Sequence, residues 1–196
     1  MGDWFQVIAD VEATEDEAPG LAAATVAWLV GGGIIGAEPA DCVLGADCGY
    51  PPGPRYASAL TQPDEFLQRL RWNNGVEICA HRRVFAPGQA PLGPVICPLC
   101  GDTVELEEPV TGQLTPCWER FSDALTAWHE GGSAEVVCPS CGQAAGFNDW
   151  HWDTGWPFAV AFLGFTFWNW PELSEPFIAE VARHLGHRVV ITGGKL

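Results

Sequence analysis

Four cysteines stand in two short pairs of the same form. The pairs are Cys97-Pro98-Leu99-Cys100-Gly101 and Cys138-Pro139-Ser140-Cys141-Gly142. Proline and glycine at these places favour a tight turn that aims both sulfurs of a pair at one point. Four thiolates can then complete a tetrahedron around Zn²⁺. The sequence therefore predicts one zinc ion on Cys97, Cys100, Cys138 and Cys141, with two disulfides or four free thiols as the alternatives.

A zinc ion that is held by four thiolates has no open position for a water molecule or a substrate. Such a site supplies folding free energy to the segment around it instead of catalysing a reaction. We therefore expect a structural metal, and any catalysis must come from other residues.

The double C-P-x-C-G pattern at residues 97–101 and 138–142 resembles the knuckles of zinc ribbons. This resemblance implies metal binding and no particular activity. The segment between the pairs is about twice the usual ~15–20 residues, so the ribbon must contain an insertion. Residues 116–129 supply one, because Phe121, Leu125 and Trp128 recur at helical spacing before a glycine pair.

Two other stretches, Phe165–Pro171 (FTFWNWP) and Leu185–Leu196 (LGHRVV…GKL), resemble an uncharacterised bacterial protein family of high-GC, actinobacterial-like organisms. That resemblance implies no chemistry.

The best candidates for catalysis lie in the segment with the most unusual composition, residues 147–171, which contains five tryptophans and five phenylalanines. Alternation places Asp149, His151 and Asp153 on one side of an extended chain. A histidine between carboxylates can act as a general base or bind a metal, and aromatic walls can stack a sugar or hold a cation. The alternative is that the three polar groups face solvent and the aromatic residues build a core.

The charge balance is strongly acidic, with nine Lys and Arg against 25 Asp and Glu in 196 residues. Such a surface repels phosphate backbones, which argues against a nucleic-acid-binding protein. It suits a basic protein partner. The other four cysteines, Cys42, Cys48, Cys79 and Cys117, are expected to be free and buried or half-buried; a second metal clip at Cys42 and Cys48 is the alternative.

Hydrophobic periodicity predicts strands at residues 4–11, 76–80, 159–168 and 187–192. Helices are expected from Pro19 to about Val30, after Thr61, and from Ser174 to Gly186. The apolar stretch Leu21–Ala37 is too short and too rich in glycine for a membrane span. Met1-Gly2-Asp3-Trp4 shows no signal peptide, so a cytoplasmic location is expected.

These elements predict an α+β fold of the ferredoxin-like, split βαβ type, with an antiparallel sheet, helices on one face and an inserted zinc ribbon. Residues 1–94 and 145–196 would form the α+β body, and residues 95–144 the ribbon. We expect a non-catalytic, cytoplasmic interaction protein with structural zinc and a basic protein partner, without nucleic acid or membrane. The alternative is a hydrolase or carbohydrate-binding protein that uses Asp149, His151, Asp153 and the Trp-rich region.

Overall fold

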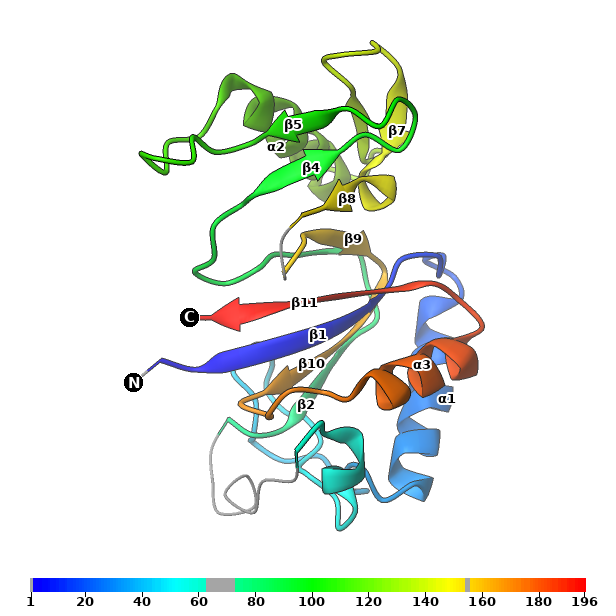
Figure 1. Ribbon diagram of the computed structural model, residues 1–196. Helices are drawn as coiled ribbons and strands as arrows, with labels where there is room; N and C mark the ends of the chain where they lie inside the picture. Colours follow the sequence, from blue (N-terminus) through cyan, green and yellow to red (C-terminus); the bar gives the residue numbers. More distant parts are fainter. Residues whose placement is uncertain (1, 63–72, 154–155) are drawn as a thin grey trace.

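The computed structural model describes residues 2–62, 73–153 and 156–196. Figure 1 shows a lower part built on the largest sheet, which we call the body, and an upper part formed by residues 94–152, which we call the ribbon. The mixed α+β class with antiparallel sheets is confirmed. The helix expected after Thr61 falls largely on residues 63–72, outside the described residues.

The body sheet has the strand order β11-β1-β10-β2, and each neighbouring pair is antiparallel. Its strands are β1 (Trp4–Asp10), β2 (Val76–Cys79), β10 (Leu163–Trp168) and β11 (Val189–Lys195). In the central pair, Ile8 lies opposite Phe165. Both side chains are buried, as are most residues of β1 and all of β10, so strands from the two ends of the chain form the middle of the body.

Two helices, α1 (Ala18–Gly31) and α3 (Glu175–Leu185), cover one side of this sheet (Figure 1). Leu29 of α1 and Val181 of α3 belong to the same buried cluster as Ile8 and Phe165. The Ser174 hydroxyl caps α3 by accepting a hydrogen bond from the Phe177 N–H, and Gly186 ends the helix in the left-handed conformation. None of the described helices is both long and apolar enough for a membrane span.

A small strand pair covers part of the other side of the sheet. It consists of β3 (Arg83–Phe85) and β9 (Ala159–Ala161). The Phe85 ring lies so close to Gly164 of β10 that a Cβ there would approach it to 2.3 Å. The single strand predicted at residues 159–168 is therefore wrong, since the chain breaks at Phe162 and its two halves join different sheets.

The ribbon consists of two hairpins, one added strand and a helix. The hairpins are β4 (Pro94–Ile96) with β5 (Thr103–Glu105), and β6 (Glu135–Val137) with β7 (Ala144–Gly146). Strand β8 (His151–Trp152) pairs with β4, and helix α2 (Pro116–His129) lies between the hairpins in sequence. The predicted inserted helix is confirmed with these same bounds. Short 3-10 helices occupy Tyr56–Ala59 and Phe147–Asp149.

Candidate metal centre

Each cysteine pair lies in the turn of one ribbon hairpin, and the two turns repeat the same backbone hydrogen bonds. In the first, the Cys97 N–H donates to the Asp102 carbonyl at 3.0 Å; in the second, the Cys138 N–H donates to the Gln143 carbonyl at 2.9 Å. The glycine after each pair has positive φ, +77° at Gly101 and +71° at Gly142. Glycine adopts this conformation without strain, so its place after each pair follows from the backbone.

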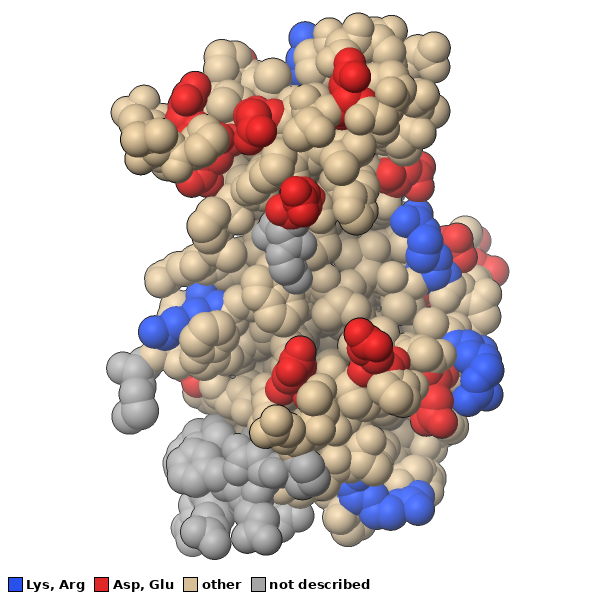
Figure 2. All heavy atoms as spheres, in the orientation of Figure 1, with Lys and Arg blue, Asp and Glu red and all other residues tan. Residues whose placement is uncertain are grey.

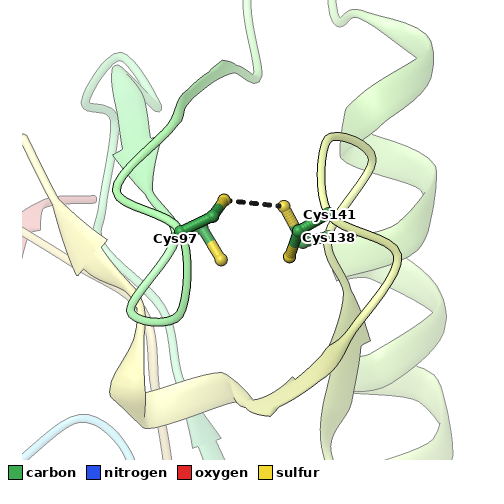
Figure 3. A group of neighbouring side chains, drawn as sticks. Cys97, Cys138 and Cys141 are labelled. Carbon is green, nitrogen blue, oxygen red and sulfur yellow. Dashed lines mark hydrogen bonds between the residues drawn. The ribbon is translucent and has the colours of Figure 1, made fainter.

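The two turns face each other and bring four sulfurs together (Figure 3). The Sγ atoms of Cys97, Cys100, Cys138 and Cys141 all lie within 4.8 Å of one another. The Cys100 and Cys138 sulfurs are 3.8 Å apart. A tetrahedron with metal–sulfur bonds of ~2.3 Å has edges of about 3.8 Å, so this set can hold one metal ion with little adjustment. Metal binding at these four predicted residues is consistent with the geometry.

The environment of the thiols lowers the pKa of Cys138 and raises that of Cys100. Burial raises the pKa of Cys138, but the backbone N–H groups of Cys141 and Ser140 and the neighbouring thiols outweigh this and lower it to about 7. For Cys100, the Asp102 N–H lowers the pKa, whereas desolvation and the other three thiols raise it, and the balance is about 12. The Cys138 thiol therefore loses its proton near neutral pH. The Cys100 thiol does so at that pH only when a cation lies among the sulfurs.

A core of buried aromatic side chains packs between the two hairpins. Phe121 of α2 is fully buried and contacts Phe147, Trp150 and Trp152 edge-on, with ring centroids 5.0–5.9 Å apart. The N-cap Thr115 starts this helix by accepting a hydrogen bond from the Cys117 N–H at 3.2 Å. The insertion therefore supplies the helix that packs both hairpins into one unit.

The Trp-rich segment mainly builds cores. Trp150 and Trp152 are buried in the ribbon, Trp168 and Trp170 are buried in the body, and only Trp156 of the five is half-buried.

Asp149, His151 and Asp153 are exposed, and Trp150 and Trp152 between them are buried. Only His151 and Trp152 form a strand, whereas Asp149 ends a 3-10 helix, so the predicted extended segment does not include Asp149. Asp149 forms an ion pair with Arg188 at 2.9 Å. Among the described residues, only the four cysteines form a group of three or more His, Cys, Asp or Glu side chains close enough to share a metal.

Two arginines join the ribbon to the body, and the sequence had indicated neither role. Arg82 donates to the carbonyls of Trp128 and Gly132 at the end of α2 and lies 4.0 Å from the Trp128 ring centroid. Arg188 donates to the Asn148 carbonyl and to Asp149. A sequence signal existed only for Arg82, which is part of the Arg82-Arg83 basic pair.

The remaining cysteines are free, as expected, but the expectation that all four are buried or half-buried is wrong for Cys48. Cys42 and Cys79 are buried, Cys117 is half-buried and Cys48 is exposed. Burial raises the pKa of the Cys42 and Cys79 thiols. Both are therefore poor nucleophiles at neutral pH.

One histidine of the body couples folding to pH. The His187 Nδ1 atom lies 2.9 Å from an oxygen of Asp10, a carboxylate that is fully buried and also accepts the Ala13 N–H. The hydrogen bond to Asp10 raises the pKa of His187, against the opposing effect of burial, and Glu17 and Glu12 add to it. The folded state therefore favours the imidazolium form.

From this we predict a stability component that is fully present below the unfolded-state pKa of ~6.5 and is lost as pH rises through the higher folded-state pKa. His187→Gln should remove this component, so the variant should unfold with a flatter pH dependence than the parent protein. Urea unfolding between about pH 6 and 8.5 measures it. The exposed His151→Gln variant is the control and should follow the parent; an unchanged slope in His187→Gln would contradict the prediction.

Comparison with known proteins adds no relative to this description. No protein-family model matches the chain, and neither the curated proteins nor the solved structures contain a significant match to it.

Proposed function

We propose that this protein is a non-catalytic, cytoplasmic interaction protein in which one structural Zn²⁺ stabilises an acidic ribbon that binds a basic protein. The observation that supports it most directly is the closed set of four thiols. Four sulfurs fill a tetrahedral zinc ion, so no position remains for a substrate. Soft thiolate ligands in this geometry favour zinc over magnesium or calcium.

The charge of the ribbon supports a basic partner. Residues 94–152 contain nine Asp or Glu and only one Lys or Arg, Arg120. Figure 2 shows acidic side chains spread over the visible face of this upper part. Zinc with four thiolates keeps a net charge of −2, so metal loading makes the ribbon more acidic still. Such a surface steers and orients a positively charged partner.

We also infer a ferredoxin-like, split βαβ topology for the body. The units β1-α1-β2 and β10-α3-β11 interleave in the order β11-β1-β10-β2, which supports this assignment.

Affinity capture from the native host, with zinc quantified on the same sample, tests the function. We expect one zinc per chain and a basic partner whose binding, repeated with purified proteins, weakens as salt is raised. Neutralising three exposed ribbon acids (Asp102→Asn, Glu105→Gln and Glu108→Gln) should weaken binding about tenfold or more.

The matched control neutralises three exposed acids of the body (Glu15→Gln, Asp16→Asn and Glu38→Gln) and should leave the affinity nearly unchanged. Equal losses in both triple variants would show that net charge acts without a ribbon interface. A zinc-loaded protein that binds no basic partner would overturn the proposal.

A further inference from the structure

An aromatic pocket opens at the end of the body sheet where β1 begins. Its volume is about 240 Å³, and it is lined by Trp4, Phe5, Gln6, Trp156, Trp170 and Glu172. None of these described lining residues belongs to the ribbon, and three of the six are tryptophans. The pocket is therefore a separate feature from the metal centre.

The structure holds two of the aromatic walls in place. The Trp170 indole N–H donates to the Asn74 carbonyl at 2.7 Å, and its ring meets Phe167 edge-on at 5.1 Å. The Trp156 ring lies against β11 at Gly193, where an added Cβ would come within 3.0 Å of its Cζ3 atom. Gly193 thus leaves room for the Trp156 ring, and the pocket is formed before any ligand arrives.

The third tryptophan, Trp4, begins β1 and is 56% exposed. Its backbone N–H donates to the Asn169 side chain at 2.9 Å, which fixes the start of the strand. The Lys195 ammonium lies 5.9 Å from the centroid of its ring. Lys195 therefore competes with a ligand cation for the Trp4 ring, and the aromatic walls that remain for a ligand are those of Trp156 and Trp170.

The polar groups of the pocket select the charge of a ligand. Both amide hydrogens of Gln6 are used, since its Nε2 donates to the Trp170 and Pro171 carbonyls, and its Oε1 already accepts the Leu173 N–H. Glu172 is exposed, and its carboxylate forms no hydrogen bond or ion pair with any described residue. The pocket therefore places one available carboxylate, that of Glu172, beside the faces of aromatic rings.

We propose that this pocket binds the alkylammonium head group of an organic cation, with trimethylammonium as the best fit. The negative faces of aromatic rings attract such a group, and the Glu172 carboxylate adds to this attraction. The volume suits one head group, because pockets for drug-sized molecules occupy roughly 300–1,000 Å³. A neutral sugar would need several polar partners, which the occupied Gln6 amide does not provide, and Glu172 repels anions.

A trimethylammonium group reaches such a site either as free choline or at the end of a trimethylated lysine side chain of another protein. Both are tested on the purified, zinc-loaded full chain, by tryptophan fluorescence and calorimetry. The probes are choline, a short peptide with one trimethyllysine, and dimethylbutanol, the neutral molecule in which carbon replaces the choline nitrogen. We expect saturable binding of a charged probe, at least about tenfold tighter than that of the neutral one.

Variants locate the binding. Trp156→Leu should weaken it about tenfold or more, and Glu172→Gln several-fold. Trp28→Leu is the matched control, because Trp28 is half-buried on α1 against Phe177 and does not line the pocket, and it should bind like the parent.

Circular dichroism identifies any variant that fails to fold, and the surface change Glu172→Gln is not expected to perturb folding.

Tighter binding of choline than of the peptide assigns the pocket to a small molecule, and the reverse assigns it to a partner's side chain. Equal binding of dimethylbutanol, or full affinity in both Trp156→Leu and Glu172→Gln, would overturn the proposal. This test uses no basic protein partner, so its result is independent of the interaction proposed for the ribbon.

Discussion

Replacing Cys97 with serine is expected to abolish the proposed zinc binding and to unfold the ribbon. The Cys97 sulfur is buried, lies within the four-thiol group and accepts the Leu99 N–H at 3.4 Å. A serine hydroxyl does not ionise at neutral pH and binds zinc weakly. Zinc contributes about 10–16 kcal/mol of apparent binding free energy in small finger peptides. We expect the apparent affinity to fall roughly a thousandfold or more, about 4 kcal/mol.

Elemental analysis of the purified variant gives zinc per chain, and hydrogen exchange shows where protection is lost. Exchange should rise in β4–β7 and α2, while β1 and β10 keep more of their protection, because their core consists of body residues. Cys48→Ser is the matched control, since Cys48 is exposed and lies outside the four-thiol group. A Cys97→Ser protein with one zinc per chain and native protection would show that Cys97 is not a ligand.

Local signals made the ribbon predictable. The two C-P-x-C-G turns require glycine for their positive φ, and the start of α2 is marked by Thr115 and Pro116, its end by Gly131 and Gly132. The alternation that exposes His151 and buries Trp150 and Trp152 can likewise be predicted from neighbouring residues. Each of these features depends on residues a few positions apart.

The features that the sequence did not reveal depend on distant partners. Arg82 donates to the carbonyl of Trp128, which lies 46 residues later in the last turn of α2, and His187 pairs with Asp10 across 177 residues. No glycine or proline stands at the break itself, because Phe162 lies between the apolar residues Ala161 and Leu163, and the nearest glycine, Gly164, lies inside β10. It arises where β9 joins β3 and β10 joins β1 and β2. Burial pattern alone does not specify which sheet an apolar strand joins.

Another long-range interaction, between Glu77 and Trp168, lies near the point where the chain leaves the body for the ribbon. Glu77 of β2 has a side chain that is 3% exposed; its Oε1 lies 2.7 Å from Arg83, and its Oε2 accepts the Trp168 indole N–H at 3.0 Å. Arg83 begins β3 and directly follows Arg82, the residue that caps α2. Glu77 therefore fixes the point from which the chain crosses to the ribbon.

Glu77→Ala should lower the free energy of unfolding by about 3 kcal/mol, because it leaves the buried Trp168 N–H without an acceptor and Arg83 without its counter-ion. Glu77→Gln keeps an acceptor for Trp168 and should cost less than Glu77→Ala. Urea unfolding measures both changes. The matched control is Glu180→Ala, whose 58% exposed carboxylate contacts Arg183 at only 3.9 Å and should change stability by about 0.5 kcal/mol or less. Equal effects of Glu77→Ala and Glu180→Ala would mean that the buried pair does not stabilise the body, and the ribbon would then rely on Arg82 and Arg188 for its position.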